Sequence, residues 1–113
     1  NIFLWGHSMG GAGTYHLGMQ YPDLWKALAL AAPAPPQVRN VKDLKIIQNV
    51  PILVLQGTKD RLLYPTREWV AEMKRLEMNF IYDEIVGADH SFFVSKNKEN
   101  MKKIFDFFVQ NRN

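Results

Sequence analysis

Residues 2–11, Ile-Phe-Leu-Trp-Gly-His-Ser-Met-Gly-Gly, join a short apolar run directly to a glycine-rich turn that holds one serine. The run from Ile2 to Trp5 does not alternate with polar residues, which is typical of a strand buried on both faces of a parallel sheet. Residues 9–21 are expected to form a helix, which Pro22 would end. The stretch therefore predicts a strand, a sharp turn at Ser8 and a helix.

The rest of the sequence repeats this alternation of strands and helices. Strands are predicted at residues 26–31, 51–56 and 80–86, and helices at residues 40–49, 65–78 and 96–110. The last helix carries apolar residues at core-facing spacing, namely Met101, Ile104, Phe105, Phe108 and Val109. Alternating strands and helices indicate an α/β fold, with a parallel sheet of about four strands flanked by helices.

Composition narrows the classes of function. The 113 residues suit one domain, and the 47% of hydrophobic residues are enough for a core. The net charge is +3, but the densest lysines, at residues 96–103, lie opposite an apolar helix face and indicate a solvated surface rather than a nucleic-acid site. The absence of cysteine excludes disulfides, and the three histidines lack ligand spacing, so no metal or cofactor is expected. No apolar run approaches the roughly 20 residues that span a bilayer.

The serine in the turn is the first candidate for chemistry. Gly6 and Gly10 flank it and are expected to make room for a strained backbone, so that the Ser8 hydroxyl projects from the carboxyl end of the strand. The N–H of Met9, at the start of the following helix, could then stabilise an oxyanion. The alternatives are an incidental serine in a glycine-rich turn and a phosphate-binding loop, although the lysine of a Walker A motif is absent.

Two further residues follow predicted strands and could activate this serine. Asp60 comes just after the strand at residues 51–56, and His90 just after the strand at residues 80–86. Because the carboxyl ends of parallel strands meet at one edge of a sheet, we expect Ser8, Asp60 and His90 to lie together. The order serine, acid, histidine fits a nucleophile, an orienting carboxylate and a general base.

Other residues compete for these roles. His7 adjoins the serine on a sharp turn and is expected to point elsewhere, and His16 lies two turns down the helix. Asp89 would have to fold back on its neighbour to orient His90. Asp83 and Glu84 lie within a predicted strand.

Four apolar residues flank the acid and the histidine. They could line an apolar acyl or alcohol pocket, and core packing explains them equally well. They are Leu62, Leu63, Phe92 and Phe93.

Together these motifs resemble the α/β-hydrolase superfamily, and within it carboxylesterases and prolyl-oligopeptidase-like hydrolases. The matching segments are residues 6–15, 21–23, 56–60 and 87–90. The resemblance covers essentially all of residues 1–113 but only the C-terminal half of the family's domain, because the family's sheet has eight strands and this chain begins at the fifth. It implies that Ser8 is the nucleophile, Asp60 the acid, His90 the base and Met9 one of two oxyanion donors.

The expected function is that of a serine hydrolase that cleaves small carboxylic esters through an acyl-enzyme. The alternatives are a prolyl-oligopeptidase-like serine peptidase and a non-catalytic fragment or interaction module of the same fold. The sequence lacks an initiator methionine and enters a strand at once, so we expect it to be part of a larger protein. The strand from Ile2 to Trp5 would then be an apolar sheet edge that pairs with the missing N-terminal half, whose loop supplies the second oxyanion donor, or with a second copy of the chain.

Overall fold

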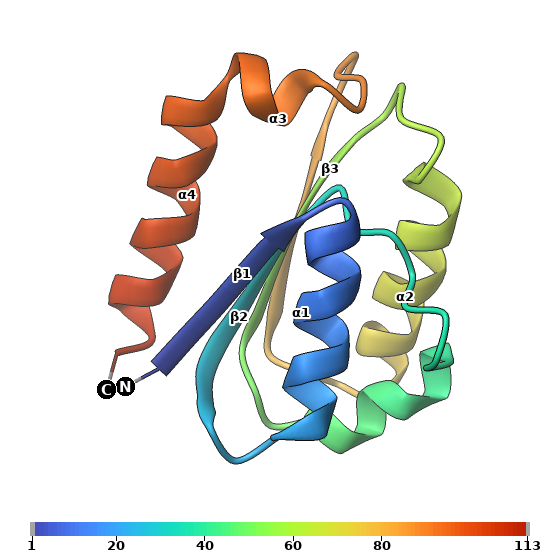
Figure 1. Cartoon of the computed structure of the whole chain (residues 1–113), viewed down its shortest axis with the longest axis vertical. Coiled ribbons are helices and arrows are strands. Elements are labelled where there is room, and N and C mark those ends of the chain that lie inside the picture. The colour runs from blue at the N-terminus through green and yellow to red at the C-terminus, as the bar shows by residue number, and fades with distance from the viewer. Residues whose placement is uncertain (1, 113) are drawn as a thin grey trace.

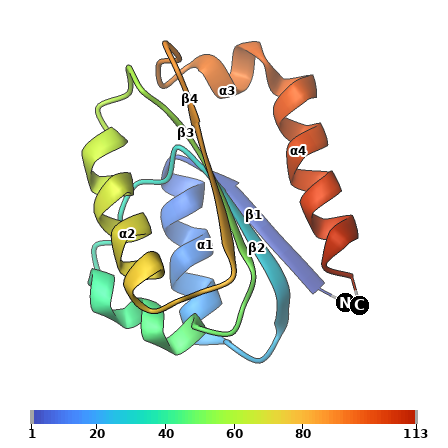
Figure 2. The ribbon, with the colours of Figure 1, turned by 180° about the vertical axis from the view of Figure 1, so that it is seen from behind.

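A computed structural model describes residues 2–112, except for the side chains of residues 93 and 94. Its centre is a sheet of four parallel strands that lie in sequence order. The strands are β1 (Ile2–His7), β2 (Trp25–Ala31), β3 (Ile52–Gly57) and β4 (Phe80–Ile85). The helices are α1 (Met9–Gln20), the 3-10 helix η1 (Val41–Ile47), α2 (Leu63–Arg75), α3 (Phe92–Ser95) and α4 (Asn97–Gln110). Figures 1 and 2 show α1 and α2 on one face of the sheet and α4 on the other.

This architecture confirms the predicted α/β class with a parallel sheet. β1 runs on to His7, two residues beyond the predicted strand. The predicted helix at residues 40–49 is a 3-10 helix, which Asn40 and Asp43 begin with a reciprocal capping box. The short helix α3 was not predicted, because four residues are too few to show a helical period.

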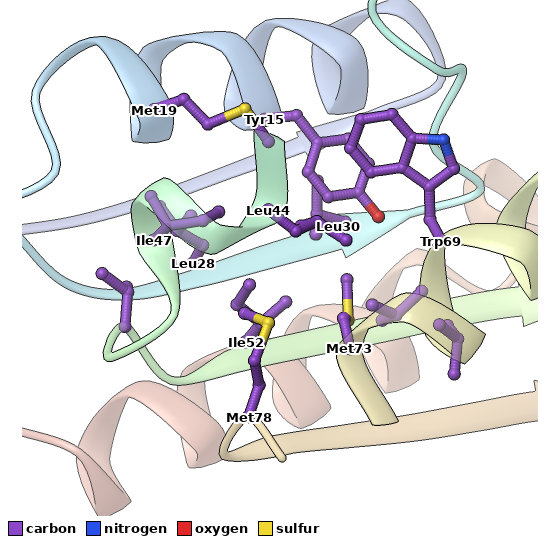
Figure 3. Packing of buried hydrophobic residues seen from close by; sticks show 13 residues of the cluster. Tyr15, Met19, Leu28, Leu30, Leu44, Ile47, Ile52, Trp69, Met73 and Met78 are labelled. Carbon is purple, nitrogen blue, oxygen red and sulfur yellow. The ribbon is translucent and has the colours of Figure 1, made fainter. Parts of the chain in front are cut away.

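Apolar side chains form a separate core on each face of the sheet. The larger core joins β2 and β3 to α1, η1 and α2, and the Tyr15 and Trp69 rings meet there at 4.4 Å between centroids (Figure 3). The smaller core packs Ile104, Phe107 and Phe108 of α4 against β2 and β3. Burial on both faces explains why β2 and β3 read as continuous apolar runs.

The predicted apolar stripe of α4 is wrong at two positions. Phe105 and Val109 are 56% and 54% exposed, whereas Phe107, which the stripe omits, is buried. α4 turns the Phe107 face toward the middle of the sheet, so Phe105 and Val109 lie beside β1, the edge strand. With Phe3 and Trp5 they line an open hollow of about 420 Å³ along this edge.

The carboxyl ends of β1, β3 and β4 lead into the loops that hold Ser8, Asp60 and His90. Because the strands are parallel, these three loops lie at one edge of the sheet. Among residues 2–112, no helix is both long enough and apolar enough to cross a membrane.

Candidate active site

Ser8 sits in a strained turn between β1 and α1. Its φ is 59° and its ψ is −116°, in a region that non-glycine residues rarely adopt. Hydrogen bonds to the end of β2 and to the segment after it hold the turn: the Ser8 N–H donates to the Ala31 carbonyl, and the Ser8 carbonyl accepts from the Ala34 N–H, both at 3.0 Å. Neighbouring main chain therefore imposes the backbone that the sequence predicted for this serine.

Only some of the glycines around Ser8 are needed for space. A Cβ at Gly6 would lie 2.0 Å from the Gly10 carbonyl oxygen, and one at Gly11 would lie 2.7 Å from the Pro33 side chain. A Cβ at Gly10 would meet no atom within 4 Å among the described residues. The prediction that both flanking glycines make room is thus right for Gly6 and wrong for Gly10, while Gly11 brings α1 close to the segment after β2.

The structure brings the three sequence-predicted residues together in one line of hydrogen bonds. His90 Nε2 lies 2.9 Å from Ser8 Oγ, and His90 Nδ1 lies 2.8 Å from Asp60 Oδ2. An ionised carboxylate can only accept, so Nδ1 carries the imidazole proton and Nε2 can accept from the serine hydroxyl. In this tautomer the histidine is ready to remove the Ser8 proton.

Solvent reaches the two ends of this triad unequally. The Asp60 side chain is fully buried, whereas 38% of the His90 side chain is exposed. Burial alone would raise the pKa of Asp60, but hydrogen bonds from the Leu62 N–H, His90 and Gln56 outweigh it and hold the pKa below the usual value. The carboxylate therefore stays ionised at neutral pH in a dry environment, where it orients the histidine strongly.

Gln56 is a supporting residue that the sequence analysis missed. It is buried at the end of β3, and its side-chain oxygen accepts a 2.8 Å hydrogen bond from the Thr66 hydroxyl of α2. Its side-chain nitrogen donates to the Gly57 carbonyl at 3.1 Å, and the side chain also helps to lower the pKa of Asp60. The sequence feature that could have identified Gln56 is a single amide side chain directly after the apolar run 52–55, because a buried amide needs hydrogen-bond partners.

The loops that hold Asp60 and His90 are tied to each other through their main chains. The Lys59 N–H donates to the Ala88 carbonyl at 2.8 Å, and the Gly87 N–H donates to the Thr58 hydroxyl at 2.7 Å. A Cβ at Gly57 would lie 2.3 Å from the same Ala88 oxygen. Gly57 thus allows the close approach that sets the Asp60–His90 distance.

The competing residues are engaged elsewhere. Asp89 accepts from the N–H and hydroxyl of Ser91, and His16 accepts from Arg39 at 3.3 Å. Lys103 binds Asp83 at 2.8 Å, and Arg67 binds both carboxylate oxygens of Glu84. His7 alone among them touches the triad: its ring stacks on that of His90.

The predicted apolar flank is largely internal. Leu62 and Leu63 are buried, Phe92 is half-buried, and the Phe93 side chain lies outside the described part. The leucines therefore pack inside the protein and offer little surface to a ligand.

Met9 is 82% exposed, and as the first residue of α1 its N–H has no carbonyl partner within the helix. Within residues 2–112, no group of three histidine or acidic residues could hold a metal ion.

Comparisons with known proteins give the same fold. A family model described as serine aminopeptidase, S33, matches residues 1–48. A predicted CIB-like hydrolase from Thermoplasma acidophilum is 24% identical with a TM-score of 0.75, and the match covers 92% of this chain and 48% of that one. Arabidopsis thaliana SOBER1 is 24% identical with a TM-score of 0.79, and the match covers 98% of this chain and 53% of that one. MGS-MChE2, an α/β hydrolase from the metagenome of lagoon sediments at Mar Chica, Morocco, is 18% identical with a TM-score of 0.77. The match covers 100% of this chain and 63% of that one.

Among curated proteins, no sequence matches the chain. The chain spans about half the length of the first two solved structures above and somewhat more of the third. All three overlay nearly all of its residues, from β1 to α4. The chain therefore has the fold of the α/β hydrolases, and it corresponds to part of the length of these matched proteins.

Proposed function

We propose that the chain carries the reactive half of a serine hydrolase that cleaves carboxylic esters through an acyl-enzyme. The observation that supports this most strongly is the pair of hydrogen bonds that link Ser8, His90 and Asp60, at 2.9 and 2.8 Å. A serine hydroxyl becomes a useful nucleophile only when a base takes its proton, and this arrangement supplies one.

In the proposed reaction, Ser8 Oγ attacks the ester carbonyl carbon while His90 Nε2 takes the hydroxyl proton. The tetrahedral intermediate collapses, the bond to the alkoxy oxygen breaks, and His90 returns the proton to the leaving alcohol. Water then attacks the acyl-Ser8 ester, again with His90 as base, and the carboxylic acid leaves. Asp60 stabilises the imidazolium in both steps and stays ionised throughout.

The negative charge on the carbonyl oxygen needs donors in both steps. We assign the Met9 N–H as one donor, because it lies at the N-terminus of α1 and directly follows Ser8. We propose that a second donor and the substrate walls come from the rest of a longer domain, or from a second copy of the chain, placed against β1. A missing donor would lower the rate by about 10²–10³-fold.

A second candidate function is hydrolysis of peptide bonds. The matching family model, described as serine aminopeptidase, favours it. The chemistry would be the same, with an amine as leaving group, so the substrate decides between the two.

The test compares p-nitrophenyl esters of acetate and butyrate with aminoacyl p-nitroanilides, using wild type and Ser8→Ala. Ester hydrolysis that exceeds anilide hydrolysis and disappears in Ser8→Ala supports the esterase. Anilide hydrolysis that depends on Ser8 supports the peptidase. Turnover that is unchanged in Ser8→Ala contradicts both.

A further inference from the structure

His7 is the last residue of β1 and directly precedes Ser8, but its side chain contacts a different member of the triad. Its ring and that of His90 are stacked, with centroids 5.2 Å apart and planes inclined by 24°. His7 is half-buried, so this contact is partly shielded from water. One imidazole therefore covers a face of the other.

A second contact joins His7 to the main chain of His90. The His90 backbone raises the pKa of the His7 imidazole, as a carbonyl that accepts a hydrogen bond from the ring does, although burial lowers this pKa more. His7 thus holds both the ring and the backbone of the same residue. A stacked apolar side chain could provide only the first contact.

Among the residues that the structure describes, the loop of His90 is attached on two sides. The hydrogen bonds from Lys59 to Ala88 and from Gly87 to Thr58 fix it on the side of Asp60. His7 fixes it on the side of β1, where Ser8 lies. The distance from His90 Nε2 to Ser8 Oγ therefore depends on an attachment that His7 provides.

We propose that His7 is a positioning residue that holds His90 in line with Ser8, chiefly through ring stacking and also through its contact with the His90 main chain. The proposal rests on the proposed function, in which His90 is the base. His7 acts through His90 and does not itself exchange a proton with the substrate.

The charge state of His7 suits this role. Burial and the neighbouring His90 lower the pKa of His7, and Asp60 opposes this only weakly. His90 and Asp60 are the titratable groups that act on it among the described residues. At neutral pH His7 is therefore uncharged, and it places no positive charge against the imidazolium that forms on His90 during the reaction.

The test uses His7→Ala, which removes both contacts, and His7→Phe, which keeps a ring but loses the bond. His16→Ala is the matched control, because His16 is also half-buried, but it lies within α1 and bonds Arg39. The first readout is the second-order rate constant for labelling of Ser8 by a fluorophosphonate. We take the loss of each contact to slow labelling about fivefold. We therefore expect roughly 25-fold slower labelling in His7→Ala, which loses both contacts, and about fivefold slower labelling in His7→Phe, which loses one.

The second readout is the proton NMR signal of the His90 Nδ1–H that bonds Asp60. It should be sharp in wild type and His16→Ala and broadened in His7→Ala, while circular dichroism stays unchanged. If His7→Ala does not fold, His7→Phe, which keeps the ring volume, carries both readouts.

Equal labelling rates and equal NMR signals in wild type and the His7 variants would overturn the proposal. If wild type is not labelled at Ser8, the proposed function fails instead. The NMR comparison then still decides whether His7 orders His90.

Discussion

Gly57 offers a sharp test of how the site is held together, because its effect is geometric. An alanine Cβ at this position would lie 2.3 Å from the Ala88 carbonyl oxygen, about 1 Å short of the ordinary contact distance of 3.4 Å. Backbone atoms meet here, so no side-chain rotation can relieve the overlap. The loop that holds His90 has to move by roughly 1 Å relative to the loop that holds Asp60.

A displacement of about 1 Å at a reacting group costs on the order of 10²-fold in rate. We therefore expect Gly57→Ala to slow fluorophosphonate labelling of Ser8 by about 100-fold and to destabilise the fold by about 1–3 kcal/mol, as overpacking does. The rate is measured by intact mass and the stability by urea denaturation.

The control for Gly57→Ala is Gly13→Ala. Gly13 lies in α1, and its Cβ would meet no atom within 4 Å among residues 2–112. Gly13→Ala should label at the wild-type rate and stabilise the helix by about 1 kcal/mol. Labelling of Gly57→Ala within threefold of both wild type and Gly13→Ala would refute the argument that this close approach sets the Asp60–His90 geometry.

Three further predictions concern single groups. Asp60→Asn should slow Ser8 labelling by about 10⁴-fold, because an amide does not hold the required His90 tautomer; labelling within tenfold of wild type would contradict this role. Tyr15→Phe should leave stability unchanged or raise it in urea denaturation, because the buried Tyr15 hydroxyl has no hydrogen-bond partner among the described residues; a loss above about 1 kcal/mol would contradict this. As the pH falls below 6.5, the free energy of unfolding should fall, because the lowered pKa of His7 means that the unfolded chain binds this proton more tightly. Urea titrations at pH 7.5 and 5.5 should show a smaller loss in His7→Phe, and an equal loss would contradict the assignment.

The parallel sheet and the grouping of Ser8, Asp60 and His90 at one edge could be predicted because both follow from chain order. Each of the three residues comes just after a strand, and parallel strands end at the same edge. The conformation of Ser8 was predictable from the Gly-x-Ser-x-Gly spacing. The sequence was thus informative wherever the position along a strand or turn decides the outcome.

Side-chain direction across the sheet was less predictable. The apolar period of α4 continues through Phe105 and Val109, but the period does not say how far the sheet extends beneath the helix. The stacking of His7 on His90 joins residues 83 positions apart, which no local pattern indicates. Gln56 helps to lower the pKa of Asp60, and the orientation of its side chain depends on where α2 places Thr66.

The central claim is that Ser8 is an activated nucleophile, and the most direct measurement is intact-mass analysis after treatment with a fluorophosphonate. We predict that wild type gains the mass of one phosphonyl group, that peptide mapping places it on Ser8, and that Ser8→Ala and His90→Ala gain none. A phosphonyl group that persists in Ser8→Ala, or wild type that gains none, would contradict the claim for this chain.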